Sequence, residues 1–270
     1  MQPILKWAGG KRQLLPEILP FIRNTKFSTY IEPFVGGGAV LFKIQPEHAI
    51  INDCNEELMN VYRQVRDVPD ELILLLKEHK ASNSLSHFYE VRGIDRTKAY
   101  QMMSPAERAA RTIYLNKTCY NGLYRVNKKG QFNAPYGKYK NPDIVTEDVI
   151  REISRYFNEN DVRICCGDYK AVLDDIPDDA FVYLDPPYMP VSDGTFTSYT
   201  RDGFSYERQL ELRDVCVALR EKGVQFLLSN SDCDAIRELY RDFNIDSVEA
   251  SRSINSRADA RGCVNELLIH

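Results

Sequence analysis

Residues 30–53 read YIEPFVGGGAVLFKIQPEHAIIND, and this stretch decides the fold class. The apolar Tyr30 and Ile31 predict a short strand, the glycines at 36–38 predict a turn, and the residues after them favour a helix. Residues 48–52 predict a second buried strand, which is closed by Asp53. This order of strand, glycine turn, helix, strand and acid is typical of one βαβ half of a nucleotide-binding α/β fold.

The α/β pattern stops after this first half and resumes near residue 162. A mainly helical pattern fills residues 56–158, and Ser104-Pro105-Ala106-Glu107 has the N-cap, proline and glutamate of a capping box. Further strands are predicted at residues 162–166, 181–184, 224–228, 244–248 and 264–269, and a helix at 207–221. A connection of about a hundred residues far exceeds an ordinary crossover, so it indicates an inserted domain.

The motif richest in chemistry is Asp185-Pro186-Pro187-Tyr188, which follows a predicted apolar strand. It therefore falls at a strand's carboxyl end, where ligands bind in open α/β sheets. Two prolines also suit a plain rigid turn. Chemistry is favoured because Asp185 supplies a carboxylate acceptor, the prolines leave neighbouring carbonyls to accept, and Tyr188 offers a flat face. These groups suit an aromatic amine, because they can accept hydrogen bonds from its two N–H groups.

A basic stretch runs from Arg111 to Pro142, in a chain whose formal net charge is −4. It contains no acidic residue, and its seven basic residues are Arg111, Lys117, Arg125, Lys128, Lys129, Lys138 and Lys140. Aromatic residues are interleaved with these charges, and residues 120–142 favour loops or a hairpin. A charge run is often only a solvated face, but this one favours a phosphate-facing surface.

Composition disfavours several other classes of protein. The seven cysteines are odd in number and form no Cys-x-x-Cys pair, which argues against a disulfide framework and a zinc site. The four histidines have no metal-ligand spacing. No apolar run approaches the length of a signal peptide core or a membrane span. We therefore expect a cytoplasmic protein with reduced thiols, no metal and no membrane partner.

The chain resembles the Dam-type (D12-class, alpha-group) DNA adenine-N6 methyltransferases over nearly its whole length. Its motifs stand in that family's order, and no single one would carry the resemblance. They are Leu5-Lys6-Trp7-Ala8-Gly9-Gly10-Lys11, residues 32–38, Asn52-Asp53, residues 121–127, residues 132–137 and Asp185-Pro186-Pro187-Tyr188.

The resemblance implies S-adenosyl-L-methionine as the cofactor and a catalytic centre made of Asp185, Pro186, Pro187 and Tyr188. It implies a flipped-out adenine that stacks on Tyr188. The implied cofactor-binding residues are Trp7, Lys11, Phe34, Gly36, Gly38, Asp53, Asp168 and Asp185. Asp53 is suited to accept both ribose hydroxyls, and Asp168 to accept the cofactor's adenine amine. Without the resemblance, Lys11 would equally be a surface lysine at the start of a helix.

The same resemblance implies double-stranded DNA as the partner, with GATC as the target. The implied DNA-binding residues are Lys6, Tyr120, Asn121, Leu123, Arg125, Asn127, Pro135 and Tyr139. Arg125 occupies the position that reads a guanine, while Tyr120 and Asn121 would fill the gap left by the flipped base. Family members with longer targets share much of this segment. Residues 252–261 are basic, and they suit a DNA-contacting loop and a solvated connection equally well. We expect a monomer.

We therefore expect an α/β protein with a class I S-adenosylmethionine-dependent methyltransferase fold. Its Rossmann-like sheet would be seven-stranded and mostly parallel, with an antiparallel last strand. Residues 1–57 and 150–270 would form the catalytic domain, and residues 58–149 a mainly helical DNA-recognition domain with a basic, aromatic hairpin at 120–142.

Other functions keep part of this pattern. One alternative is methylation of cytosine N4, RNA or a protein amide, and another is a catalytically silent DNA-binding module. A nicotinamide oxidoreductase is disfavoured because Leu41 stands where the last glycine of the dinucleotide pattern belongs. The resemblance fits an enzyme of a restriction system as well as one that acts alone.

Overall fold

The computed structural model describes residues 1–7, 9–188, 204–251 and 263–270, so the predicted basic loop at 252–261 lies outside the described residues. The strands are β1 (Thr29–Glu32), β2 (His48–Ile51), β3 (Asp161–Ile164), β4 (Ala180–Leu184), β5 (Gln225–Ser231), β6 (Ile245–Ser251) and β7 (Cys263–Ile269). The α-helices are α1 (Leu15–Arg23), α2 (Leu41–Ile44), α3 (Glu56–Asp67), α4 (Pro69–Ala81), α5 (Leu85–Gly93), α6 (Ala99–Met102), α7 (Pro105–Thr118), α8 (Glu147–Glu159), α9 (Tyr206–Glu221) and α10 (Asp234–Leu239). Short 3₁₀ turns are η1 (Lys11–Gln13), η2 (Ile94–Arg96), η3 (Tyr120–Gly122) and η4 (Tyr169–Val172).

The strands form one seven-stranded sheet in the order β3-β2-β1-β4-β5-β7-β6. β1 pairs in parallel with β2 and β4, and β4 pairs in parallel with β5. β7 is antiparallel to both of its neighbours, β5 and β6. The predicted α/β class and the mostly parallel seven-stranded sheet with an antiparallel last strand are confirmed. The inserted DNA-recognition domain and its boundaries stay a prediction.

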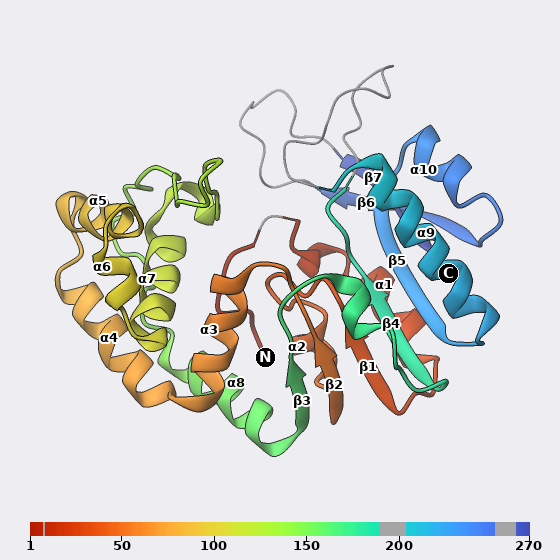
Figure 1. The fold of residues 1–270 in the computed structure, drawn as a ribbon, viewed down its shortest axis with the longest axis horizontal. Coiled ribbons are helices and arrows are strands. Elements are labelled where there is room, and N and C mark those ends of the chain that lie inside the picture. The colour runs from red at the N-terminus through yellow and green to blue at the C-terminus, as the bar shows by residue number, and fades with distance from the viewer. Residues whose placement is uncertain (8, 189–203, 252–262) are drawn as a thin grey trace. The chain divides into compact units, whose positions relative to one another are not determined.

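The strand order changes direction between β1 and β4, which lie side by side in Figure 1. Ile31 of β1 is in register with Val182 of β4, so the two strands end at the same edge of the sheet. All five residues of β4 are buried, as expected for a strand covered on both faces. A reversal of strand order at the carboxyl ends of parallel strands is where ligands bind in such sheets.

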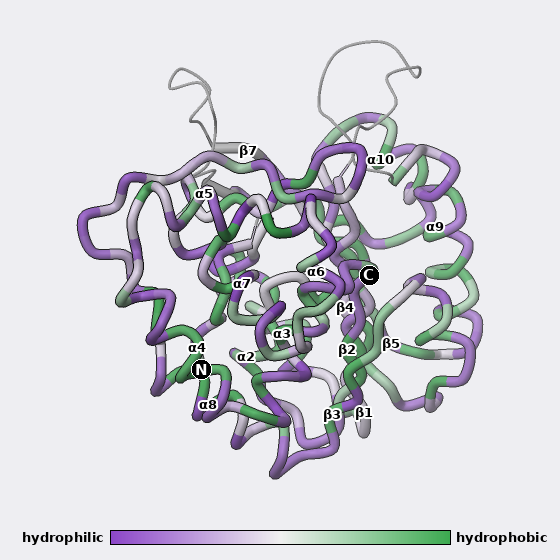
Figure 2. Tube along the Cα trace, turned by 60° about the vertical axis from the view of Figure 1, so that its left-hand side comes forward, coloured by the Kyte–Doolittle hydropathy of each residue, from purple (hydrophilic) through white to green (hydrophobic). Residues whose placement is uncertain are grey.

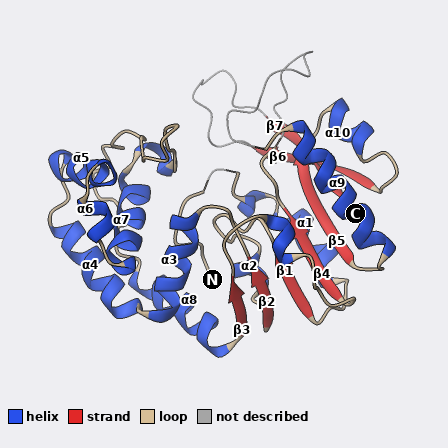
Figure 3. Ribbon diagram, viewed as in Figure 1, coloured by secondary structure: helices blue, strands red, loops and turns tan. Residues whose placement is uncertain are grey.

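The chain divides into two compact units, and the first consists of residues 11–34, 48–51 and 169–270. Its core includes Tyr30, Phe181 and Tyr183, which are fully buried. α9 lies along β5 (Figure 3), and hydrophobic and hydrophilic residues alternate along this helix (Figure 2). The buried residues of α9, Gln209, Leu212, Cys216 and Leu219, recur at the spacing of one helix face, so this face lies against the sheet.

The second unit consists of residues 1–10, 35–47 and 52–168. Helices α3, α4, α7 and α8 pack against one another in it, and Phe42, Tyr62 and Phe157 form an aromatic cluster. The predicted capping box is confirmed at the start of α7, where Ser104 and Glu107 bond each other's backbone N–H groups. Among the described residues, no helix combines the length and apolar character needed to cross a membrane.

Candidate active site

Asp185-Pro186-Pro187-Tyr188 directly follows β4, at the edge of the sheet where β1 also ends. Asp185 is brought there because the run Ala180–Leu184 is apolar and buried, whereas a carboxylate and two prolines cannot continue the strand. The strand therefore delivers the aspartate to the switch point of the sheet.

Lys11 extends from η1 to the Asp185 carboxylate. Its Nζ lies 2.8 Å from Asp185 Oδ1 and 3.8 Å from Glu266 Oε2. The same ammonium lies 4.5 Å from the centre of the Tyr188 ring, within the range of a cation–π contact. Only 5% of the Lys11 side chain is exposed, so this charge is placed by the protein interior and not by solvent. A surface lysine at a helix start is therefore ruled out for Lys11.

Burial raises the pKa of Asp185 to about 6, because an ionised carboxylate loses its hydration there. The Lys11 ammonium opposes this shift and lowers the pKa, whereas the negative charge of Glu266 raises it. Asp185 is thus an ionised carboxylate at neutral pH whose charge state depends on two neighbours of opposite sign.

Glu266 of β7 is a site residue that the sequence analysis missed. Its Oε2 accepts a 2.6 Å hydrogen bond from the Tyr188 hydroxyl. Burial raises the pKa of Tyr188 well above its ordinary value, so the hydroxyl keeps the proton that it donates. The available signal was a glutamate directly before the apolar Leu267, Leu268 and Ile269 in a predicted strand.

Two buried amides hold the backbone of the motif. Gln209 of α9 donates from Nε2 to the Pro187 carbonyl at 3.2 Å, and Asn230 of β5 donates to Gln209 Oε1 at 3.1 Å. Both residues are fully buried. These two hydrogen bonds hold the Pro187 carbonyl and so fix the turn after Asp185. The sequence analysis did not identify either amide.

Phe34, a predicted cofactor residue, follows β1 in the same unit. Its ring lies 4.9 Å from that of Tyr169 and 5.8 Å, edge to face, from that of Phe204. The three rings form an aromatic wall just after the carboxyl end of β1.

In the other unit, Asp53 and the glycine turn are joined. The Asp53 carboxylate accepts hydrogen bonds from the backbone N–H of Gly36 at 3.1 Å and of Asn55 at 2.9 Å. One bond goes to each oxygen, which leaves each oxygen with further acceptor capacity. Burial raises the pKa of Asp53 against the effect of these bonds. The two backbone N–H groups thus fix the orientation of a carboxylate that can accept further hydrogen bonds.

Trp7 packs on the same turn. Gly36 has φ +47°, and a Cβ there would stand 3.0 Å from Trp7 Cδ1. A Cβ on Gly38 (φ +70°) would lie 2.7 Å from Phe42 Cε2, so glycine is required at both positions. The Tyr124 ring stacks on the Trp7 ring, and the two ring centres are 5.1 Å apart. Asp168 is exposed at the end of this unit, immediately after Gly167, which donates to the Asp53 carbonyl.

The predicted DNA-binding residues lie on one continuous segment and on Lys6. Residues 125–134 form a hairpin, in which Val126 pairs with Phe132 and Asn133 N–H donates to the Arg125 carbonyl. Arg125 is exposed, and its guanidinium donates to Asn133 Oδ1 at 2.6 Å and to the Asn133 carbonyl at 3.1 Å. Asn127 closes the turn of the hairpin through its side chain, which accepts from Lys129 and Gln131 N–H.

The start of this segment is tied to Lys6. Asn116 binds the Lys6 backbone through both side-chain atoms, and Lys6 Nζ lies 5.4 Å from the centre of the Tyr139 ring. Tyr120 is 56% exposed, and Asn121 has the left-handed φ of 56°. Leu123 is half-buried, and the Pro135 carbonyl accepts from Tyr120 N–H at 2.8 Å.

The expectation that all seven basic residues from Arg111 to Pro142 face phosphates is wrong for Arg111. Its side chain is 5% exposed and pairs with Asp95 at 2.8 Å. Lys117 is half-buried, and burial lowers its pKa. Five of the seven basic residues are exposed, and these are Arg125, Lys128, Lys129, Lys138 and Lys140. Charge counting missed the pairing because Asp95 lies outside the acid-free stretch.

No group of histidine, cysteine, aspartate and glutamate suited to hold a metal ion occurs within the described part of the chain.

Comparison with known proteins gives consistent matches. The family model of the D12 class N6 adenine-specific DNA methyltransferases matches residues 7–254. The chain is 47% identical to the type II methyltransferase M1.LlaDCHI of Lactococcus lactis subsp. cremoris, covering 100% of this chain and 95% of that protein. It is 43% identical to the type II methyltransferase M.MjaIII of Methanocaldococcus jannaschii, covering 100% and 98%. It is 33% identical to the DNA adenine methylase of Escherichia coli K12, covering 98% and 93%.

Proposed function

The chain belongs to the D12 class of N6 adenine-specific DNA methyltransferases, and from this premise we propose that it methylates adenine N6 in double-stranded DNA with S-adenosyl-L-methionine. The observation that carries the proposal is the placement of the buried Asp185 carboxylate at the switch point of the sheet, beside Lys11, Tyr188 and Glu266.

The chemistry follows from the nature of the nucleophile. The amino nitrogen of adenine is a poor nucleophile because its lone pair is delocalised into the ring. Asp185 and the Pro186 carbonyl accept hydrogen bonds from its two N–H groups. These bonds draw the nitrogen toward tetrahedral geometry. Positive charge then develops on the nitrogen, and the fixed carboxylate stabilises it.

The neighbours of Asp185 support this electrostatic role. Lys11 keeps the carboxylate ionised in a site where burial alone favours the acid. The hydrogen bond to Glu266 fixes the Tyr188 ring, and an adenine turned out of the duplex stacks on that flat face. The Gln209–Asn230 pair holds the Pro187 carbonyl and so sets the direction of the turn.

The residues of the second unit fit a cofactor with a ribose. The Asp53 carboxylate, oriented by Gly36 and Asn55 N–H, is suited to accept two vicinal hydroxyls. Gly36 has no side chain beside the Trp7 ring, so its backbone can approach a ligand at the turn. When bound, S-adenosyl-L-methionine supplies an electrophilic methyl group. The other residues of the proposed cofactor-binding set are Lys11, Phe34, Gly38, Asp168 and Asp185.

We further propose GATC as the target and Arg125 as a reader of guanine. An arginine fork matches the O6 and N7 acceptors of guanine in the major groove. Support comes from the exposed position of Arg125 on the hairpin of residues 125–134 and from the exposed lysines around it. Lys6, Tyr120, Asn121, Leu123, Asn127, Pro135 and Tyr139 are the other proposed DNA contacts. The protein would act as a monomer.

The test is transfer of a labelled methyl group from the cofactor to random-sequence duplex DNA, followed by mapping of the modified base. N6-methyladenine within GATC is expected. N4-methylcytosine would reject the proposed base, and N6-methyladenine in another sequence would reject only the target. An Asp185→Ala variant serves as the control for a contaminating activity, and calorimetry with S-adenosyl-L-methionine tests the cofactor separately.

A further inference from the structure

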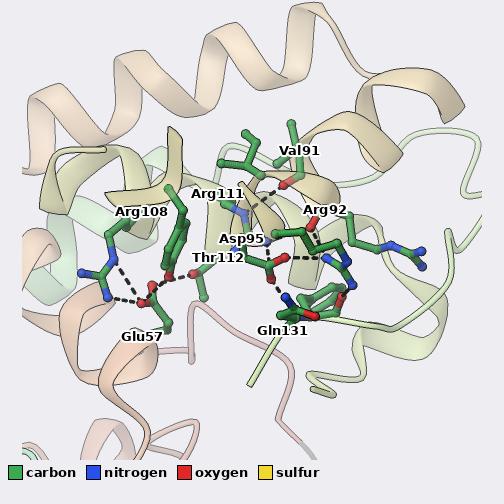
Figure 4. Close-up of polar contacts among 12 residues, drawn as sticks. Glu57, Val91, Arg92, Asp95, Arg108, Arg111, Thr112 and Gln131 are labelled. Carbon is green, nitrogen blue, oxygen red and sulfur yellow. Dashed lines mark hydrogen bonds and ion pairs between the residues drawn. The ribbon is translucent and has the colours of Figure 1, made fainter. Parts of the chain in front are cut away.

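The buried carboxylate of Asp95 binds the backbone of the hairpin formed by residues 125–134. Asp95 lies in η2, and only 8% of its side chain is exposed. Its Oδ2 accepts a 2.8 Å hydrogen bond from the backbone N–H of Phe132 and lies 2.8 Å from Arg111 Nη2 (Figure 4). Its Oδ1 accepts from Arg96 Nη1 at 2.5 Å. Three donors therefore converge on one carboxylate, and one of them belongs to the hairpin.

Arg111 connects this carboxylate to the helices. Besides Asp95, it donates to the carbonyls of Val91 at 2.9 Å and Arg92 at 3.1 Å, in the last turn of α5. Carbonyls in the last turn of a helix lack the usual helical partner, and a cation can bind them there. The Val91 carbonyl also accepts from Ile94 N–H, and the Arg92 carbonyl from Arg96 Nη1. Asp95 neutralises the Arg111 guanidinium. The pair thus joins α5, η2 and α7 into a frame for the hairpin.

Two arginines of the same frame also bind the hairpin backbone. Arg96 Nη2 donates to the Phe132 carbonyl at 2.7 Å, and Arg92 Nη1 donates to the Ala134 carbonyl at 3.2 Å. Both polar groups of the Phe132 main chain are therefore engaged, one by Asp95 and one by Arg96. Because these contacts involve only the backbone, they fix the position of the hairpin without regard to its side chains.

The held residues flank the one that orients Arg125. Phe132 and Ala134 are the chain neighbours of Asn133, and Asn133 accepts both hydrogen bonds from the Arg125 guanidinium. We propose that Asp95 is a positioning residue for target discrimination, which acts by fixing the hairpin so that Arg125 is presented to a base edge in one place. The proposal rests on the proposed reading of guanine by Arg125.

The position of the hairpin should control how well the enzyme distinguishes its target sequence from altered sequences. A bidentate contact to guanine needs both nitrogens of the fork at hydrogen-bond distance, so a displacement of about 1 Å removes its advantage. A phosphate contact tolerates the same displacement because it has no sequence preference. Loosening the hairpin should therefore reduce selectivity much more than general DNA affinity.

The test compares Asp95→Asn with Glu57→Gln. Glu57 forms a similar carboxylate–arginine pair with Arg108 of α7 and also accepts from Tyr100 and Thr112 (Figure 4). These three partners belong to α6 and α7 and not to the hairpin. The free energy of unfolding is measured for both variants, so that a general loss of stability is controlled. Arg96→Gln is a milder second variant, because the Arg96 side chain is 33% exposed and its removal buries no unpaired charge.

Two readouts are needed. The first is hydrogen exchange of the hairpin amides in the protein without DNA, which we expect to be faster in Asp95→Asn and Arg96→Gln and unchanged in Glu57→Gln. The second is the ratio of kcat/KM on a GATC duplex to that on a duplex altered at one guanine. This ratio should fall by about tenfold or more in Asp95→Asn, since a bidentate contact is worth that much. The affinity of Asp95→Asn for S-adenosyl-L-methionine should stay within twofold of that of the wild type.

A double variant separates positioning from a general structural role. If Asp95 acts through Arg125, adding Asp95→Asn to Arg125→Ala should reduce the discrimination ratio no further. An unchanged ratio in Asp95→Asn overturns the proposal, as does unchanged exchange in the hairpin. If wild-type enzyme methylated all duplexes at one rate, the proposed target would be rejected together with the discrimination role of Asp95. The exchange result would still decide whether Asp95 holds the hairpin.

Discussion

The Lys11 ammonium lies 2.8 Å from a carboxylate oxygen of Asp185, although one residue precedes α1 and the other follows β4. Both side chains are largely buried, so this ion pair sets the charge of the candidate catalytic group. Glu266 lies 3.8 Å from the same ammonium and acts on Asp185 in the opposite direction. The charge state of Asp185 thus reflects a balance between two neighbours that can be changed one at a time.

Replacing Asp185 by alanine should abolish methyl transfer while leaving the fold and DNA binding intact. In the proposed mechanism the carboxylate stabilises charge that forms only in the transition state, a contribution of roughly 3–4 kcal/mol. Asp185→Asn should fail as well, because an amide carries no charge. Single-turnover rates on duplex DNA, with DNA affinity measured in parallel, provide the check. Transfer within tenfold of wild type would refute this role.

The wild-type enzyme should lose activity as the pH falls through about 6, because Asp185 then becomes protonated. Lys11→Gln removes the charge that lowers this pKa, so the acid limb of the kcat/KM profile should move to higher pH. The loss of rate should accordingly be larger at pH 7 than at pH 8. The profile is measured at saturating cofactor, and an acid limb that stays in place would contradict the link between Lys11 and Asp185.

Glu266→Gln should have the opposite effect. Removing a negative charge lowers the pKa of Asp185, so the acid limb should move to lower pH. The glutamine can still accept from the Tyr188 hydroxyl, so the rate at the optimum should change little. Asp246→Asn is the matched control, since it removes an exposed carboxylate on the adjacent strand β6. Equal profiles for the two variants would exclude an effect of Glu266 on Asp185.

DNA affinity should fall with salt concentration despite the negative net charge. Counterion release gives a log–log slope of about −0.9 for each neutralised phosphate. Because Arg111 is paired with Asp95 and Lys117 is half-buried, the basic stretch offers five exposed residues. Its share of the slope should therefore be no steeper than about −4.5. Replacing Lys128 and Lys129 by alanine should weaken all sequences about equally. A slope near zero would mean that this stretch does not bind phosphates.

Arg125→Ala should reduce the rate on GATC and narrow its advantage over sites altered at one guanine. A bidentate guanine contact is worth about 1–3 kcal/mol of discrimination, whereas a phosphate contact gives none. Arg125→Lys should restore less than its charge suggests, because an ammonium cannot match two acceptors with a planar fork. Methyl transfer is measured on duplexes that each differ at one position. A uniform slowing of all of them would make Arg125 a phosphate contact.

Much of the fold could be predicted because it rests on local patterns. The apolar run before Asp185 predicted β4, and the capping box at Ser104 predicted the start of α7. Each of these signals is contained in a few consecutive residues, where hydrophobic periodicity and turn chemistry act directly.

The missed features depend on residues that are distant in sequence. Glu266 approaches Lys11 and Tyr188 because β7 pairs with β5, and Arg111 is neutralised because Asp95 of η2 lies 2.8 Å from it. A count of charges treats every arginine as exposed, so it cannot distinguish Arg111 from Arg125. Pairing between distant elements decides which charges remain for a ligand.

The position of β7 between β5 and β6 also has a consequence for biosynthesis. A ribosome releases β6 before β7, yet β7 is the strand that joins β6 to β5. A nascent chain that lacks residues 263–269 already contains Lys11, Asp185 and Tyr188, but not Glu266. Closure of this side of the sheet and completion of the charge cluster therefore both require β7. We expect chains stalled before β7 to be recognised by proteases and chaperones as unfinished.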